Sequence, residues 1–210
     1  MATIALFGAT GRTGRRVLHR ALEAGHTVRV LVRDPARLGH EGDGLTVICG
    51  DVLDPAPVAR AVSGADVVLS LFGQVKGSPR TLQTDGTRII VEAMRAAGVR
   101  RIVTLSGGGL RAPQDRPRVA DRVIRLLLRM LSGHVLADAE GHLAVLRASG
   151  LDWTVVRGPR LTEAPGRGSY RQGWVGVGTG TSISRDDLAD FIITQVEDRS
   201  FVGRMPFLSS

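Results

Sequence analysis

Cysteine and long hydrophobic runs are scarce in this sequence of 210 residues. Cys49 is the only cysteine, which excludes an internal disulfide and argues against a metal cluster held by cysteines. No apolar run reaches the roughly 18 residues that a membrane-spanning helix needs, so we expect no membrane partner. The chain enters an apolar, strand-like segment directly, and we expect no signal peptide. The expected location is therefore the cytoplasm.

Lysine is also scarce, because Lys76 is the single lysine among 28 basic residues. With 20 acidic residues, the chain has a net charge of +8 and an isoelectric point of about 11.3. Such a basic chain raises the question of nucleic-acid binding. The arginines are scattered, however, and no long basic tail is present, so we expect a small-molecule ligand rather than nucleic acid. The same charge would help to attract an anionic dinucleotide.

Short apolar segments alternate with helical patterns along the chain, which predicts an α/β protein with a parallel sheet. We expect strands at residues 4–7, 27–32, 45–49, 65–72, 101–105, 151–156 and 201–208, and helices at residues 15–24, 57–63, 81–97, 134–149 and 187–196. Length and composition suit a single domain over residues 1–210. The glycine-rich residues 162–180 predict a hairpin, within a small substrate-side lobe at about residues 157–182.

The other predicted elements are arranged around a glycine turn near the start of the chain. The sequence Phe7-Gly8-Ala9-Thr10-Gly11-Arg12-Thr13-Gly14 lies between an apolar strand and an amphipathic helix. Gly8 would permit a tight turn, Gly11 the close approach of a pyrophosphate, and Gly14 the packing of helix on strand. Free amides and the helix dipole would then face the anion, which predicts a Rossmann-type, doubly wound domain. The alternative is a glycine-rich turn without a ligand.

An arginine stands where a domain that binds NAD would carry an acid. Arg33 lies at the tip of the second predicted strand, nineteen residues after Gly14, where an acid would receive the ribose 2′-hydroxyl. An arginine there suits the 2′-phosphate of NADP, and Arg37 would close a second side of that phosphate. Asp34 keeps an acid one place further on. We expect NADP(H) in preference to NAD(H); the competing interpretation is that both arginines are solvated loop residues.

Polar residues and glycines follow the next predicted strands at the same edge of the sheet. The Asp51 carboxylate would accept a hydrogen bond from adenine, or would serve only as a turn or capping aspartate. Gly73 would let a dinucleotide pass across the backbone. Ser106 would orient substrate or cofactor, or would simply end the fifth strand. After the sixth strand, Gly158-Pro159 would keep the backbone close to the nicotinamide.

Residues 111–133 are irregular at first and then basic and apolar. Apolar residues recur there at helical spacing, at Val119, Val123, Ile124, Leu127, Leu128 and Leu131. Such a stripe packs on the core or on a second subunit more often than on a membrane, so we expect a monomer or a homodimer. His134 and His142 are lone helical histidines, which are more often structural than catalytic. Neither has partners at metal-ligand spacing, and we expect no metal site.

Taken in order, these segments resemble the atypical short-chain dehydrogenase/reductases that bind NAD(P)H. The chain is most similar to the flavin reductase/biliverdin-IX-beta reductase group and more distantly to NmrA-like proteins. Further matching segments are Leu146-Arg147-Ala148-Ser149-Gly150-Leu151 and Ser182-Ile183-Ser184-Arg185-Asp186-Asp187-Leu188. The resemblance implies pyrophosphate binding at Thr10, Gly11, Arg12, Thr13 and Gly14, binding of the adenosine phosphate at Arg33 and Arg37, and adenine contacts at Asp51 and Val52. It also implies ribose contacts at Leu71, Phe72 and Gly73, and nicotinamide contacts at Ser106, Gly158 and Pro159.

Two departures from the family pattern bear on the activity. Short-chain reductases pair a catalytic Tyr-x-x-x-Lys with the serine, but Tyr170 is the only tyrosine here and has no lysine near it. Arg160 stands where the flavin/biliverdin group has a histidine, and it would attract an anionic substrate such as a flavin phosphate. We therefore expect an NADPH-dependent oxidoreductase that transfers a hydride to a planar flavin or quinone, with a proton from solvent. The alternative is an NADP-binding sensor without turnover, whereas an epimerase would need the absent tyrosine.

Overall fold

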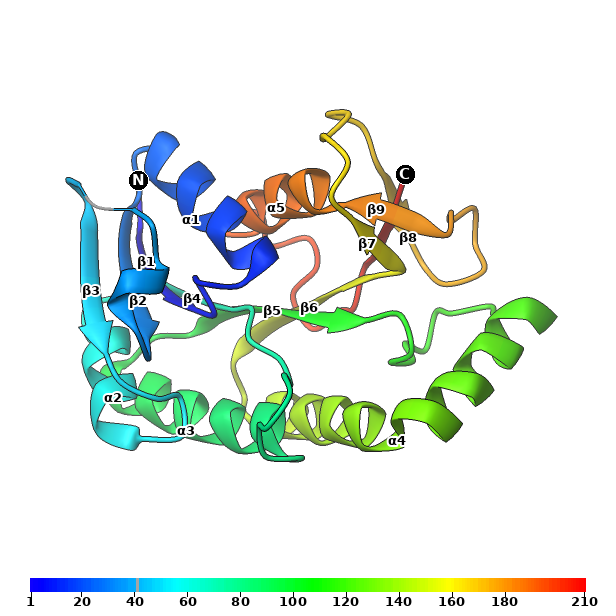
Figure 1. Ribbon diagram of the computed structural model, residues 1–210, viewed down its shortest axis with the longest axis horizontal. Coiled ribbons are helices and arrows are strands. Elements are labelled where there is room, and N and C mark those ends of the chain that lie inside the picture. The colour runs from blue at the N-terminus through cyan, green and yellow to red at the C-terminus, as the bar shows by residue number, and fades with distance from the viewer. Residues whose placement is uncertain (41) are drawn as a thin grey trace.

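In the computed structural model, which describes residues 1–40 and 42–210, eight strands form a sheet through the middle of the molecule (Figure 1). The side chains of residues 120, 122–125, 127–129 and 131 lie outside this description. The strands are β1 (Thr3–Phe7), β2 (Thr27–Val32), β3 (Leu45–Cys49), β4 (Val67–Ser70), β5 (Arg101–Gly107), β6 (Asp152–Gly158), β8 (Arg171–Gly173) and β10 (Phe207–Ser209). Their order is β3-β2-β1-β4-β5-β6-β10-β8, and all neighbours are parallel except β10 and β8.

Helices cover both faces of this sheet (Figure 1). One face carries α1 (Arg12–Glu23) and α5 (Arg185–Thr194), and the other carries α2 (Pro55–Val62), α3 (Leu82–Ala97) and α4 (Val119–Ala148). Each layer has its own apolar core, and central strand residues such as Leu6 and Val68 are fully buried between them. The predicted doubly wound parallel sheet is therefore confirmed. No helix in the described residues is both long and apolar enough to cross a membrane.

The strand order reverses between β1 and β4. From β1 the chain runs outward to β2 and β3, and then returns to the opposite side of β1 as β4. Doubly wound sheets bind ligands at the carboxyl ends of the strands beside such a reversal. The two strand ends stay in contact here, because the amide of Leu71 donates to the carbonyl oxygen of Phe7 at 2.9 Å. This edge of the sheet is where the candidate site is built.

The predicted hairpin at residues 162–180 is limited to an antiparallel bridge between Trp174 and Val177, and the strands of this region pair elsewhere. Short β7 (Arg160–Thr162) pairs in parallel with β9 (Ser182–Ser184) in a separate two-stranded sheet, and β8 pairs with β10 at the edge of the main sheet. Both pairings satisfy backbone groups through segments distant in sequence, which local glycine patterns cannot reveal. The last strand begins at Phe207 rather than at residue 201, because residues 199–204 form turns closed by the amides of Val202 and Arg204.

Several other predicted boundaries also differ from the structure. Helix α1 begins three residues early, because Gly11 is its N-cap and already accepts the Arg15 amide at 2.9 Å. Helix α4 joins the predicted irregular segment to the predicted helix, and Ser132 is non-helical at the junction (φ −143°, ψ 38°). Its first part extends away from the body of the molecule in Figure 1. Of the predicted apolar stripe, Val119 is exposed, whereas the other five side chains lie outside the described residues.

Candidate cofactor site

Close backbone contacts in the glycine turn require its first and last glycines. Gly8 has φ +87°, and a Cβ there would lie 2.7 Å from backbone atoms of Leu71 and Phe72. A Cβ on Gly14 would lie 2.0 Å from the Gly8 carbonyl oxygen. At Gly11 the corresponding distance is 3.2 Å, which is tight but less restrictive. The turn therefore presses α1 against β1 and against the end of β4.

The start of α1 presents backbone amides toward this strand edge. Gly11 makes no side-chain capping bond, and the first turn of the helix contains no acidic residue. The amides of Arg12, Thr13 and Gly14 precede the first intrahelical donor, so helix geometry leaves them without a partner inside the helix. Together with the positive end of the helix dipole, they form a site suited to an anion such as a diphosphate.

A carboxylate that sequence reasoning missed lies beside these amides. Glu163 follows β7 and accepts from Arg12 at 3.2 Å, from Arg16 at 3.1 Å and from Arg185 at 2.8 Å. Arg185 also donates to the hydroxyl of Thr13 at 3.0 Å. The hydrogen bond from Arg185, followed by the nearby arginine charges, lowers the pKa of Glu163. Glu163 thereby ties the substrate-side lobe to α1.

The arginines expected at the adenosine phosphate both lie on the segment after β2. Arg33 and Arg37 are exposed, and within the described chain neither forms an ion pair. Asp34 is occupied as the cap of the short helix η1 (Pro35–Arg37), where it accepts from the Ala36 amide at 3.1 Å. Arg15 of α1 donates to the Arg37 carbonyl oxygen at 2.6 Å and so holds this segment against α1. The acid is thus used locally, and the arginines stay free.

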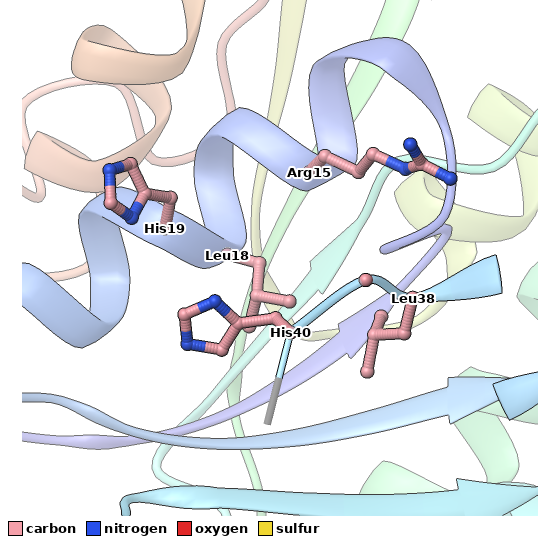
Figure 2. A pocket seen from close by; sticks show the side chains of 6 residues that line it. Arg15, Leu18, His19, Leu38 and His40 are labelled. Atoms are coloured by element: carbon pink, nitrogen blue, oxygen red, sulfur yellow. The ribbon is translucent and has the colours of Figure 1, made fainter. Parts of the chain in front are cut away.

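A cavity of about 240 Å³ opens beside this bridge between α1 and the segment after β2 (Figure 2). It is lined by Arg15, Leu18, His19, Leu38, Gly39 and His40. The rings of His19 and His40 both line it, with centroids 6.5 Å apart and ring planes tilted by 59°. The sequence pattern did not single out Arg15, although its position directly after the glycine turn was visible.

Asp51 adopts the turn geometry that was one of its two predicted roles. One carboxylate oxygen accepts from the Leu53 amide at 2.9 Å, and Asp54 separately caps α2 through the Ala56 amide at 3.1 Å. Val52 and Phe72 meet over α3, because a Cβ on Gly86 would lie 3.2 Å from Val52 and 2.8 Å from Phe72. The structure thus brings the predicted adenine and ribose residues to one edge.

Asp138 of α4 anchors the segment that follows β4. It is 3% exposed and accepts from the Gln74 side chain at 2.7 Å, from the Gln83 amide at 2.9 Å and from the Thr84 amide at 2.8 Å. The Gln83 side chain in turn donates to the Phe72 carbonyl oxygen at 3.2 Å. Burial alone would raise the pKa of Asp138, but these hydrogen bonds lower it. Sequence reasoning missed this anchor, whose one signal was a lone carboxylate on the inward face of a helix.

The predicted nicotinamide residues lie on adjacent strand ends. Ser106, 8% exposed, is in register with Arg157 of β6, and Gly107 is in register with Gly158. A Cβ on Gly108 would lie 3.2 Å from the Gly158 carbonyl oxygen, so the two turns touch. Pro159 follows directly, and exposed Arg160 begins β7. The residues expected at the ring therefore lie at the ends of β5 and β6, and the residue expected at the substrate begins β7.

The remaining candidate acids and bases have structural surroundings. His142 is 2% exposed and bonds to the hydroxyls of Thr87 at 2.7 Å and Thr104 at 3.1 Å. Burial lowers the pKa of His142 to about 4. Tyr170 packs edge-on against Phe191 at 5.9 Å. The described residues contain no group of three His, Cys, Asp or Glu side chains that could hold a metal ion.

An uncapped helix start behind a glycine turn, at the reversal of a doubly wound sheet, is the arrangement of nucleotide-dependent Rossmann domains, and this chain is one of that class. Residues 8–199 match the family described as NAD(P)H-binding, and the chain belongs to that family. The predicted resemblance to NAD(P)H-binding reductases is thereby confirmed.

Relatives of the chain carry reductase names. A (4-alkanoyl-5-oxo-2,5-dihydrofuran-3-yl)methyl phosphate reductase from Streptomyces griseus is 36% identical over 78% of this chain, which spans 51% of that relative. A short-chain dehydrogenase/reductase from Veillonella parvula, solved in complex with NADP, has a TM-score of 0.80 at 20% identity, over 100% of this chain and 95% of the other. An anaerobillin reductase from Escherichia coli O157:H7, ChuY, has a TM-score of 0.79 at 20% identity, over 99% and 96%. At such identities, the two solved structures support the fold.

Proposed function

We propose that this protein is an NADPH-dependent oxidoreductase that transfers a hydride to a planar acceptor such as a flavin or a quinone. The observation that carries the proposal is the set of backbone amides at the start of α1, behind glycines that cannot be enlarged without a clash. Membership of the NAD(P)H-binding family and the reductase name of the Streptomyces griseus relative support reductase chemistry. That relative's name also specifies a phosphate ester as its substrate.

The preference for NADPH is assigned to the segment after β2. Free guanidinium groups on Arg33 and Arg37 would hold the 2′-phosphate through charge-assisted, bidentate hydrogen bonds. Arg15 supports this role because it fixes the Arg37 backbone against α1. Asp34 accepts the Ala36 amide with one of its oxygens, and its single negative charge is outnumbered by the two guanidinium groups. Asp51 and Val52 would flank the adenine.

The remaining tasks of the chain are to bind and orient the two reactants. When bound, the cofactor supplies a hydride from its nicotinamide ring. The amides of Arg12, Thr13 and Gly14 would hold the diphosphate, whereas the Gly11 amide already donates to the Gly8 carbonyl oxygen at 3.0 Å. Leu71, Phe72 and Gly73 would line the ribose. Ser106 with the Gly158-Pro159 turn would flank the ring and exclude water from one side. Arg160 would draw in an anionic substrate.

Proton transfer by a tyrosine–lysine pair is not part of this proposal. Tyr170 lies against α5, and Lys76 lies on the exposed segment after β4, so neither belongs to such a pair. A flavin or quinone takes its proton from solvent, which suits a site without this pair. The same observation favours a second candidate function, in which the protein binds NADP as a redox sensor and does not turn it over.

Steady-state NADPH oxidation, followed at 340 nm with FMN, riboflavin and a soluble quinone as acceptors, tests the proposal. We expect saturable NADPH binding by calorimetry and turnover with at least one acceptor, with NADPH preferred over NADH. Binding without consumption would favour the sensor. A protein that binds neither dinucleotide would refute both functions.

A further inference from the structure

Two segments at the carboxyl ends of β5 and β6 carry an excess of positive charge. Residues 107–118 and 157–182 contain seven arginines and only two carboxylates. The arginines are Arg111, Arg116, Arg118, Arg157, Arg160, Arg167 and Arg171. Because the net charge of the whole chain is +8, these segments hold most of its excess. The imbalance lies on the side of the sheet away from the proposed 2′-phosphate residues, next to Ser106 and Gly158.

Both carboxylates in these segments are already neutralised. The Asp115 carboxylate accepts hydrogen bonds from both terminal nitrogens of Arg157, at 2.8 and 2.9 Å, and the Arg157 side chain is fully buried. Burial alone would raise the pKa of Asp115, but the bonds from Arg157 and from two backbone amides lower it. Glu163 is held by Arg12, Arg16 and Arg185. Neither acid is therefore left to balance the exposed arginines.

We define the arginine surface as Arg111, Arg116, Arg160 and Arg171. All four are exposed, and within the described part of the chain none of them forms an ion pair with a carboxylate. Arg171 donates only to a neutral backbone carbonyl, that of Gly178, at 3.3 Å. Unpaired guanidinium groups are the side chains best suited to bind a phosphate or carboxylate through two parallel hydrogen bonds.

The Arg157–Asp115 pair joins the two segments into one rigid surface. Arg157 also donates to the carbonyl oxygens of Leu110 at 2.6 Å and Met205 at 2.9 Å. Asp115 accepts the Val175 amide at 3.0 Å, and the Arg116 amide donates to the Val175 carbonyl oxygen at 2.9 Å. The segment after β5 is thus fixed to β6 and to the segment after β8. Arg116 and Arg171 are consequently carried on connected backbone.

We infer that the arginine surface selects acceptors whose planar ring carries an anionic group, a phosphate or a carboxylate. This inference rests on the proposed function, because it concerns the second reactant of the same site. The cofactor's phosphates are assigned to the opposite end, at the α1 turn and after β2, so they do not account for this charge. The surface would act in two ways, by steering the anion toward the site and by binding it directly.

FMN and riboflavin form a matched pair of probes, because they share one ring system and differ in a phosphate. We expect the KM for FMN to be about tenfold below that for riboflavin at low ionic strength, as charge-assisted contacts to several arginines imply. The ratio should shrink to about threefold in 0.3 M salt, because exposed charges are screened. In the double variant Arg116→Gln/Arg160→Gln the ratio should approach one. Arg60→Gln removes an exposed arginine of α2 and should leave the ratio unchanged.

Equilibrium binding separates this inference from the proposed function. Quenching of flavin fluorescence measures FMN and riboflavin affinities without turnover. If no acceptor is reduced, but FMN binds more tightly than riboflavin and loses this advantage in Arg116→Gln/Arg160→Gln, the oxidoreductase proposal fails and the inference stands. If both flavins are reduced with equal KM and bind equally, the inference is overturned and the oxidoreductase stands. A single-stranded oligonucleotide of 12 nucleotides that displaces FMN and binds more tightly than FMN would overturn the inference in favour of a nucleic-acid surface.

Discussion

Replacing Asp138 by asparagine tests whether a carboxylate on α4 supports the cofactor segment. Helix α3 has no side-chain cap of its own, and Asp138 supplies one from a different helix. Its oxygens accept four bonds, of which two come from Thr84, through its amide at 2.8 Å and its hydroxyl at 2.7 Å. An asparagine of the same shape keeps one oxygen but presents an NH₂ group to donors. Two of the four donors would therefore lose their acceptor.

The expected cost follows from burial. A buried donor left without an acceptor costs about 1–3 kcal/mol, so two such donors make Asp138→Asn destabilising by about 2–6 kcal/mol. For a domain of this size, that loss lowers Tm by roughly 10 °C. Because Gln74 and Gln83 connect Asp138 to the segment after β4, we also expect the Kd for NADPH to rise about tenfold, an order-of-magnitude figure for displaced positioning groups.

Calorimetric scans and NADPH titrations measure the two effects separately. Asp85→Asn is the matched control. Asp85 lies in the first turn of α3, the turn that Asp138 caps, but its side chain is 41% exposed. That control should lose no more than about 1 kcal/mol. Gln74→Met removes the link to the segment while keeping the α3 cap, and it should weaken NADPH binding with little change in Tm. An Asp138→Asn protein with the wild-type Tm would refute the buried cap, and one with lowered Tm but unchanged Kd would refute the link to the cofactor.

Three further predictions concern the turn, the phosphate segment and the buried histidine. Gly14→Ala should raise the Kd for NADPH more than Gly11→Ala does, because the new Cβ would lie 2.0 Å from the Gly8 carbonyl oxygen rather than 3.2 Å. Titration of both variants with NADPH checks this prediction, and equal increases in Kd would contradict it. Arg33→Gln/Arg37→Gln should weaken NADPH binding about tenfold or more and NADH binding less than about twofold; a parallel loss for both dinucleotides would contradict the assigned role. Burial lowers the pKa of His142 from 6.5 to about 4, so the unfolded state binds a proton at a higher pH than the folded state does. The free energy of unfolding should therefore decrease by about 3 kcal/mol as the pH falls from about 6.5 to about 4. Urea unfolding of His142→Asn should show a flatter pH dependence there, and an unchanged slope would contradict it.

Elements determined by local pattern were predictable from the sequence. Residues 27–32 and 45–49 match β2 and β3 to the residue, because each is rich in β-branched residues and has polar or glycine residues close by. Gly8 and Gly14 were assigned to a tight turn and to helix–strand packing, and the structure has both contacts. Gly98 ends α3 in the left-handed conformation, as expected of a helix-terminating glycine. In each case the physical cause lies within a few residues of the effect.

Features that depend on distant partners were not predictable in the same way. Arg12 and Glu163 are 151 positions apart, and Gln74 and Asp138 are 64 apart, so no local pattern links them. The hairpin prediction missed the main pairing of this region for the same reason, because β7 pairs with β9, which follows β8 in the sequence. Arg157 stands out in the sequence because it belongs to an otherwise apolar strand, and a buried arginine requires a buried acceptor. Its partner, Asp115, lies in a segment that showed no periodic pattern.

Ion pairing on α1 explains why cofactor choice would be made after β2. Arg12, Arg16 and Arg20 lie on α1, but they bond to Glu163 and to two aspartates of α5, Asp186 and Asp190. Their charge therefore fastens α1 to its neighbours and is largely cancelled at the helix surface. What remains for the diphosphate is the row of backbone amides, which a diphosphate of NAD or of NADP satisfies equally. Discrimination between the two cofactors thus depends on guanidinium groups without a carboxylate partner in the described chain, and Arg33 and Arg37 meet that condition.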